Sequence, residues 1–254
     1  MILAVDIGNT NTTCALFEGD QIKTRFRLGT DLGVTPDELA ASLEGILRLK
    51  RLELKGIKHV LLASVVPPLT LVWQEMCLKY LGYAPKIPSP QNLGLPVLLK
   101  NPAEVGIDRV LNALAGWQKY RTQLIIVDYG TATTFDCVSE KGEYLGGAIA
   151  PGINLAAEAL FQKTSMLPRV DLWHPPEKAL GKDTFEALRS GILWGFAALT
   201  DGLVTKLSLE FEKKPRIIAT GGLAPVMQKL SYQIEKVEPN LTLEGLYFWF
   251  QKYR

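Results

Sequence analysis

The segment VDIGNTNTT, which begins at Val5, has residue types and spacing that suit phosphate binding. Asp6 and Gly8 come directly after a short apolar run, and they are followed by a cluster of amide and hydroxyl side chains: Asn9, Thr10, Asn11, Thr12 and Thr13. A glycine lets backbone amides approach a ligand closely, and the short side chains add further donors. A carboxylate beside phosphate is favourable if it holds a cation that bridges to the phosphate oxygens.

The same pattern occurs a second time, in VDYGTATTFDCV from Val127. Without gaps, this segment aligns with the first one as follows: Val5, Asp6, Gly8 and Thr12 with Val127, Asp128, Gly130 and Thr134. Each copy follows an apolar run, ILAV or LIIV, and leads into a second β-prone run, which predicts a hairpin. One copy alone is typical of an ordinary turn. Two copies favour two similar lobes that face each other, with Asp6 and Asp128 as cation-site residues on opposite sides of one cleft.

A third glycine turn lies in PRIIATGGLAPV. We expect a strand over residues 216–219, a turn at Thr220, Gly221 and Gly222, and a helix from about Pro225. The double glycine would let a flat ligand lie against the backbone. An ordinary strand-to-helix turn explains the segment nearly as well.

The catalytic candidate lies between the two phosphate turns, in NPAEVGIDRVLNALAGW. The helical spacing of the apolar residues after Arg109 puts Gly106, Asp108 and Arg109 at a helix N-terminus, which suits anions. Asp108 could accept a proton from an alcohol, and Arg109 could hold a substrate oxygen or a transferring phosphoryl group. Position alone favours the alternative, a capping aspartate with a surface ion pair.

Other signals predict the elements around these motifs. A capping box at Thr35–Glu38 begins a helix, HVLLASVVPP is a buried strand, and helices are expected over 69–81 and 240–253. Asp183 with Glu186 is expected to cap a long helix to about Leu209, with a break near Gly202. The apolar residues of this helix exceed one stripe, which predicts that it buries two sides.

The composition of the 254-residue chain excludes several classes of protein. A formal charge of +2 gives no strong attraction to nucleic acid or membrane, and the apolar runs are too short for a membrane helix. The two histidines and three scattered cysteines fit neither histidine-centred catalysis, a zinc site nor a disulfide framework. We therefore expect a cytoplasmic protein whose general base is a carboxylate.

These motifs, taken in order, resemble those of type III pantothenate kinases, members of the acetate and sugar kinase, Hsp70 and actin superfamily. The resemblance rests on an ordered set that runs over nearly the whole chain: DIGNTNTT, SVVP, NPAEVGIDR, VDYGTATTFD, GGAIAPGI, GKDTFEALRSGI, ATGGLA and LTLEGL. It implies an α/β fold of two actin-like (ribonuclease H-like) lobes, each a mixed sheet flanked by helices, with boundaries at 1–117 and 118–254. It also implies ATP-dependent phosphorylation of pantothenate, the first step of coenzyme A biosynthesis.

The resemblance also implies a role for each motif. Residues 6–13, Ile7 included, would form the first phosphate loop, with magnesium positioned indirectly through Asp6. Thr131, Gly221 and Gly222 would contact ATP, and Asp128 would bind a monovalent cation, potassium or ammonium. Pantothenate would be bound by Gly106, Ile107, Asp108 and Arg109, with Asp108 as the base, and by Thr184 from the neighbouring subunit of a homodimer. The chain departs from the family at Ile107, where alanine is usual, and at Leu99 and Lys100, where a tyrosine is often found.

Three alternatives share this fold. The chain could be a catalytically silent regulator, a kinase of another small alcohol such as a sugar, or a structural filament former. The intact Asp6, Asp108 and Asp128 argue against the regulator, and the chain is short for the insertions that many sugar kinases carry.

Overall fold

The first sheet is formed by an antiparallel meander to which one parallel strand is added. In the computed structural model, which describes residues 1–253 and leaves out the side chain of Gln91, the strand order is β3-β2-β1-β4. The strands are β1 (Ile2–Ile7), β2 (Asn11–Glu18), β3 (Gln21–Gly29) and β4 (His59–Ser64). β1 lies antiparallel to β2 and parallel to β4, so its carboxyl end meets the start of β2 at a tight turn and lies beside the end of β4. The predicted hairpin is thereby confirmed.

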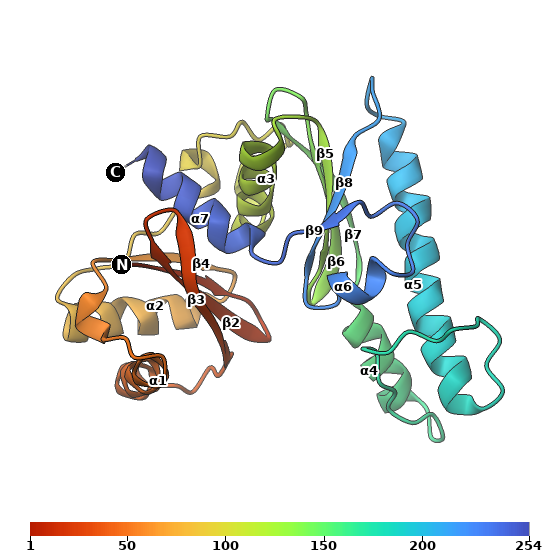
Figure 1. Cartoon of the computed structure of the whole chain (residues 1–254), viewed down its shortest axis with the longest axis horizontal. Helices are drawn as coiled ribbons and strands as arrows, with labels where there is room; N and C mark the ends of the chain where they lie inside the picture. Colours follow the sequence, from red (N-terminus) through yellow and green to blue (C-terminus); the bar gives the residue numbers. More distant parts are fainter. Residues whose placement is uncertain (254) are drawn as a thin grey trace. The chain divides into compact units, whose positions relative to one another are not determined.

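The second sheet repeats this arrangement. Its order is β7-β6-β5-β8-β9, with β5 (Leu124–Tyr129) antiparallel to β6 (Ala132–Val138) and parallel to β8 (Arg216–Gly221). The remaining strands are β7 (Tyr144–Pro151) and the short β9 (Lys236–Val237). In each sheet, the strand that carries the motif aspartate as its next-to-last residue therefore lies between its own hairpin partner and a parallel strand (Figure 1).

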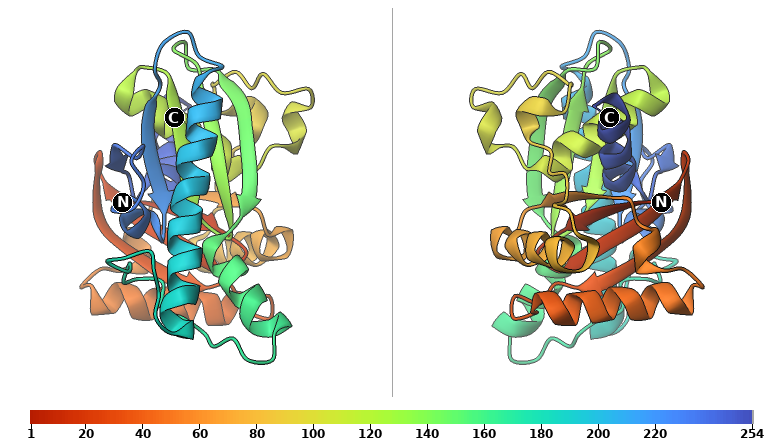
Figure 2. Two further views of the ribbon diagram at one scale, coloured as in Figure 1. Left: turned by 90° about the vertical axis from the view of Figure 1, so that its right-hand side faces the viewer. Right: turned by 90° about the vertical axis from the view of Figure 1, so that its left-hand side faces the viewer.

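Two helices cover one face of the first sheet, as the right-hand view of Figure 2 shows. They are α1 (Pro36–Leu49) and α2 (Pro67–Met76), and a π-helical turn (Cys77–Leu81) continues α2. The predicted capping box of α1 is confirmed, because Thr35 and Glu38 bond each other's backbone amides. Alternate residues of β1 pack with these helices in one core. The C-terminal helix α7 (Leu241–Lys252) also contacts the first sheet. The ring of its Tyr247 stacks on the ring of Phe17 in β2, with 4.5 Å between the ring centroids.

The second sheet packs its apolar side chains against α5 (Thr184–Ser208). Figure 2 shows this helix running along the sheet, with α4 (Ile153–Lys163) beside its N-terminal part. Asp183 caps α5 as predicted, through a 2.8 Å bond from the Glu186 amide. The predicted break near Gly202 is wrong, because the helix continues to Ser208. The short α6 (Ala224–Met227) follows β8.

The chain forms two compact units that differ from the predicted single division at residue 117. Unit 1 comprises residues 1–94, 101–115 and 242–254, and unit 2 comprises residues 95–100 and 116–241. α3 (Ile107–Tyr120) is thus shared between them, and most of α7 belongs to unit 1. The sequence could not show this, because a helix that returns to an earlier unit carries no local signal of where it packs.

No helix among residues 1–253 is both long and apolar enough to span a membrane.

Candidate functional site

The first of the two predicted phosphate loops is a four-residue turn between β1 and β2. The Gly8 amide donates to the Asn11 carbonyl at 3.1 Å, and a side chain at position 8 would approach that carbonyl to 3.2 Å. The residues at its tip, Asn9, Thr10 and Asn11, are exposed to solvent. Ile7 and Thr12 are buried instead, and Ile7 packs in the core of the unit. Any role of Ile7 in binding therefore falls to its backbone.

Thr30 secures this loop, and sequence reasoning missed it. Its hydroxyl donates to the Gly8 carbonyl at 2.7 Å, and its amide donates to the Thr10 carbonyl at 3.1 Å. The same hydroxyl lies 3.4 Å from that of Thr12. A single threonine after Gly29 carries no motif, so only the pairing of β2 with β3 reveals it.

The second predicted phosphate loop, between β5 and β6, is one residue shorter than the first. The Gly130 amide donates to the Ala132 carbonyl at 3.0 Å, and Thr131 is exposed at the tip. Asp128 pairs with Thr134, as Asp6 pairs with Thr13. The ungapped alignment of Thr12 with Thr134 is therefore wrong, because the extra residue in the first turn shifts the strand that follows. A shift of one residue also exchanges the faces of a strand. Consistently, Thr133 is buried like Thr12.

The third glycine turn lies directly beside Asp128. β8 pairs in parallel with β5, which sets Thr220 against Asp128 and Gly221 against Tyr129. Gly221 has a φ of +89°, and a Cβ there would lie 2.6 Å from both the Asp128 Oδ1 atom and the Tyr129 carbonyl carbon. Only glycine tolerates both the positive φ and the lack of space for a Cβ atom. Gly222 is exposed, with nothing within 4 Å of an added Cβ.

Asp108 occupies the second position of α3, in unit 1. Its carboxylate is partly buried and accepts the Arg109 amide at 2.9 Å. Burial raises the pKa of Asp108, and the bond from Arg109 opposes this only in part. A raised pKa makes a carboxylate a stronger base, which is the property that proton abstraction requires. The neighbouring Ile107 is buried, so the residue that departs from the family pattern points into the protein.

The donor types at the two loops suit hard cations. Among residues 1–253 no group of three or more histidine, cysteine, aspartate or glutamate side chains could hold a metal by itself. Asp6 and Asp128 each stand at the end of a strand beside a glycine turn. Magnesium in nucleotide sites commonly takes one or two carboxylates, and phosphate oxygens and water complete its shell. These residues therefore fit a cation that arrives with a nucleotide.

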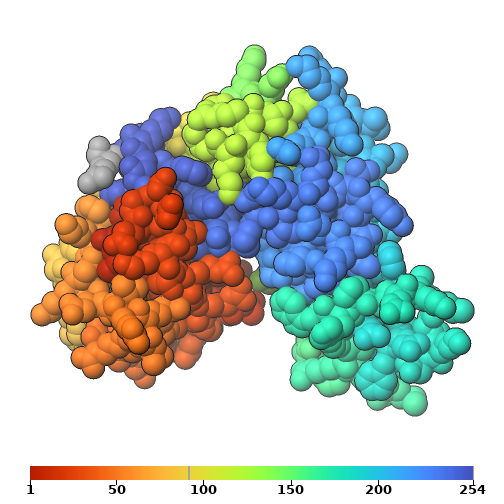
Figure 3. All heavy atoms as spheres, in the orientation of Figure 1, coloured from red at the N-terminus to blue at the C-terminus, as the bar shows by residue number. Residues whose placement is uncertain are grey.

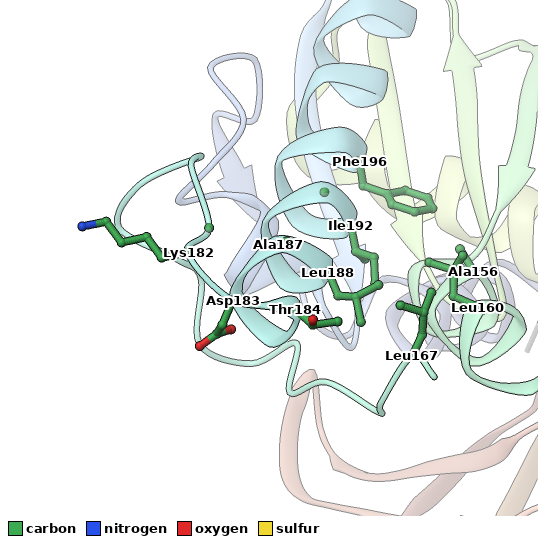
Figure 4. Close-up of a pocket in the computed structure, with 12 residues that line it drawn as sticks. Ala156, Leu160, Leu167, Lys182, Asp183, Thr184, Ala187, Leu188, Ile192 and Phe196 are labelled. Carbon is green, nitrogen blue, oxygen red and sulfur yellow. The ribbon is translucent and has the colours of Figure 1, made fainter. Parts of the chain in front are cut away.

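Thr184 is exposed at the first position of α5, at the end of an apolar groove. The groove has a volume of about 790 Å³ and lies between α4 and α5 of unit 2. Figure 4 shows Leu160, Leu188 and Ile192 turned toward the same space, whereas Lys182 extends away. The surrounding segment, drawn in teal in Figure 3, stands out from the rest of unit 2 and exposes several large apolar side chains: Leu155, Met166, Trp173, Leu180 and Phe185.

The apolar residues of α5, whose number predicted two buried sides, mostly pack within unit 2. Ile192 and Leu193 are buried, and Trp194, Phe196 and other residues of α5 pack partly against the same core. The helix is therefore a core helix along much of its length. Its exposed strip carries small residues: Gly191, Gly195, Ala198 and Gly202. The groove, rather than the circumference of α5, is the exposed apolar surface beside Thr184.

Residues 95–100, where the family often has a tyrosine, belong to unit 2. The amide of Leu98 donates to the Tyr144 carbonyl at 2.8 Å, and Val97 pairs in parallel with Tyr144. Leu99 lies against Gly146, since a Cβ there would come within 3.0 Å of the leucine Cδ2 atom. Leu99 therefore covers the backbone of β7.

Comparison with known proteins connects these features to one family. Residues 2–206 match the family described as type III pantothenate kinase. Proteins named type III pantothenate kinase from Desulfatibacillum aliphaticivorans and Geobacter sulfurreducens are each 46% identical to the chain. The alignments cover 99% of this chain and 98% of the first protein, and 100% of this chain and 100% of the second.

Solved structures of lower identity share the fold. A Campylobacter jejuni protein, described as a Baf family transcriptional activator, gives a TM-score of 0.62 at 18% identity and covers 99% of this chain and 98% of its own. The ROK family glucokinase of Streptomyces griseus gives a TM-score of 0.52 at 11% identity, and the comparison covers 96% of this chain and 97% of the glucokinase. These likenesses confirm the predicted actin-like α/β fold.

Proposed function

Since the chain belongs to the type III pantothenate kinase family, we propose that it transfers the γ-phosphoryl group of ATP to the hydroxyl group of pantothenate. This reaction begins coenzyme A biosynthesis. The observation in the structure that supports it best is Asp108, a partly buried carboxylate with a raised pKa at the start of a helix. A capping aspartate with only a structural role would be expected to keep an ordinary or lowered pKa.

Asp108 acts as the general base in this proposal. Its carboxylate accepts the proton of the pantothenate hydroxyl as the oxygen attacks the γ-phosphorus, and the bond from phosphorus to the bridging oxygen of ADP breaks. Arg109, on the same turn of α3, would hold the substrate or the transferring group. Pantothenate would be bound by residues 106–109 and by Thr184.

The two glycine loops would bind the nucleotide. The exposed residues 9–11 and the exposed Thr131 have donor groups that suit phosphate oxygens. Gly222 is exposed with open space beside its backbone, so it would face the nucleoside, with Gly221 next to it. Asp6 would hold magnesium, directly or through water, and Asp128 would hold a monovalent cation such as potassium or ammonium. When bound, these cations offset the negative charge of the phosphates. The three free cysteines, all of them buried, agree with a cytoplasmic location.

We further propose that the enzyme is a homodimer in which Thr184 completes the pantothenate site of the partner. The support is the apolar groove beside Thr184 and the exposed apolar side chains around it. Monomeric proteins rarely leave such a surface uncovered, and a second copy of the chain is an occupant always present with it.

Turnover of ATP with a panel of alcohols tests the activity. We expect phosphorylation of pantothenate, measured by mass spectrometry of the product, and little reaction with sugars or glycerol. A preference for a sugar would identify a different alcohol kinase. Nucleotide binding without turnover of any alcohol would favour the regulator.

Subunit mixing tests the shared site. Asp108→Asn and Thr184→Ala are purified separately, shown to be weakly active, and refolded together. In a shared site each heterodimer regains one site free of both changes, so the activity rises above either parent. If the mixture gives only the average of its parents, each site is built within one chain.

A further inference from the structure

Gly106 leaves the space that the carboxylate of Asp108 occupies. A Cβ at position 106 would lie 2.4 Å from the Asp108 Oδ1 atom and 3.6 Å from its Cγ atom. Real Cβ atoms do not approach other heavy atoms so closely. The next nearest atom, Cγ of Arg109, is 3.9 Å away, which is an ordinary contact. Of these neighbouring groups, only the Asp108 carboxylate is close enough that a side chain at position 106 would displace it.

The backbone of Gly106 does not itself require glycine. Its φ lies outside the left-handed range, unlike that of Gly221. Its carbonyl accepts the amides of Arg109 at 3.2 Å and Val110 at 3.4 Å, so the residue sits at the N-cap of α3. Serine, threonine, asparagine and aspartate are preferred there because their side chains bond the free amides of the first turn. Here the Asp108 Oδ1 atom already bonds the Arg109 amide, from the position that a capping side chain would take.

We propose that Gly106 is a positioning residue for the general base: by lacking a side chain, it lets Asp108 hold its Oδ1 atom against the Arg109 amide and so fixes the direction of the carboxylate. This inference rests on the proposed function. It differs from the expectation that Gly106 serves by touching pantothenate, because the effect passes through Asp108. A displaced base is costly, since a misplacement of about 1 Å can reduce a rate by about 100-fold.

The test uses two substitutions at one position. Gly106→Ala adds only the methyl group, and Gly106→Ser adds a favourable capping residue. We expect both variants to fold with a melting temperature equal to or above that of the wild type, because the displaced atom is the end of a flexible side chain. We expect kcat to fall by about 100-fold, with the KM for ATP unchanged. Gly45→Ala, on the exposed side of α1 with nothing within 4 Å, is the matched control and should keep full activity.

A double-mutant cycle distinguishes positioning from direct substrate contact. If Gly106 acts through Asp108, Gly106→Ala should cause no further loss in an Asp108→Asn background. An equal loss in both backgrounds, or wild-type kcat in Gly106→Ala, would overturn the proposal.

The crystal structure of Gly106→Ala gives a readout that does not depend on activity. We expect the Asp108 Oδ1 atom to have left the Arg109 amide, and an unmoved carboxylate would also overturn the proposal. Failure of the wild type to phosphorylate pantothenate would count against the proposed function alone, because this structural test remains.

Discussion

The hairpin turn after Asp6 in unit 1 and the one after Asp128 in unit 2 share their strand pairing but are secured by different means. The longer first turn exposes Asn9, Thr10 and Asn11, and it is held from outside by hydrogen bonds from Thr30. The shorter second turn is held by close backbone packing. Gly221 lies against Asp128, and Gly152 lies against Thr131. A Cβ added at Gly152 would lie 2.0 Å from the Thr131 carbonyl oxygen.

We propose that this difference corresponds to a division of roles. A turn held by hydrogen bonds can adjust to a ligand that the exposed donors of unit 1 would bind. A turn closed by glycine contacts has less freedom, which would suit the binding of one ion beside Asp128. Unit 1 also carries Asp108, so the comparison predicts that changes in unit 1 alter the chemistry and that changes near Asp128 alter the response to cations and the stability.

The largest effect is expected from Asp108→Asn, which removes the proposed base of unit 1. Turnover should fall by about two to four orders of magnitude while the fold is kept. Near-normal activity in a folded variant would mean that another group takes the proton. Asp20→Asn, in an exposed turn of the same unit, is the control and should change neither activity nor stability.

The same variant should show a pH-dependent gain in stability. Because the folded-state pKa of Asp108 is raised, its protonated form favours folding, and the wild type loses this contribution as pH rises through the folded-state value. Asparagine cannot ionise. The difference in unfolding free energy, measured with urea, should therefore grow in favour of the variant as pH rises above the ordinary aspartate value and then stay constant. A constant difference at all pH values would contradict the raised pKa.

A cation series examines the carboxylate of unit 2. Activity should be poor in sodium-only buffer and should be restored by potassium or ammonium at equal ionic strength. Asp128→Asn should weaken this activation, since it removes the charge that would bind the ion. An enzyme indifferent to the monovalent cation would leave Asp128 as a turn residue or a partner in the magnesium site.

Gly221→Ala should destabilise the protein by about 1–3 kcal/mol, because alanine is strained at a φ of +89° and its Cβ would meet the backbone of Tyr129. Chemical denaturation gives the value. Gly222→Ala is the adjacent control, and its Cβ would enter open space. Equal stability of the two variants would contradict the tight packing of the second turn.

The smallest effect is expected from Thr30→Val, which removes the hydroxyl that bonds the Gly8 carbonyl. We expect about a fivefold weaker affinity for ATP, corresponding to about 1 kcal/mol for one hydrogen bond. Calorimetric titration with ATP measures the affinity. Thr24→Val, farther from the turn on β3, controls for the substitution itself. A loss as large as that of Asp108→Asn would mean that Thr30 has a direct part in the reaction.

A cluster in unit 2 shows how far sequence patterns fall short. Glu238 is buried and accepts hydrogen bonds from Lys119 at 2.5 Å and from Tyr120. Burial by itself would raise the pKa of this carboxyl, but the bonds from Lys119, Lys236 and Tyr120 lower it to about 2. Lys119 and Tyr120 lie more than 100 residues before Glu238 in the chain, and no motif joins them to it. The sequence therefore gave no reason to single out Glu238.

The sequence by itself determined the features that depend on local patterns. The apolar runs before Asp6 and Asp128 predict strands, the glycines after them predict hairpins, and Thr35 and Asp183 predict the starts of helices. Each of these rests on residues a few positions apart, where propensity and capping act.

Only the tertiary structure decided which residues meet across long separations. The one-residue offset between the two turns follows from strand register, because pairing, and not sequence alignment, sets which residues are opposite each other. The return of α7 to unit 1 follows from packing such as that of Tyr247 on Phe17. The raised pKa of Asp108 follows from burial, which depends on what the whole fold removes from water.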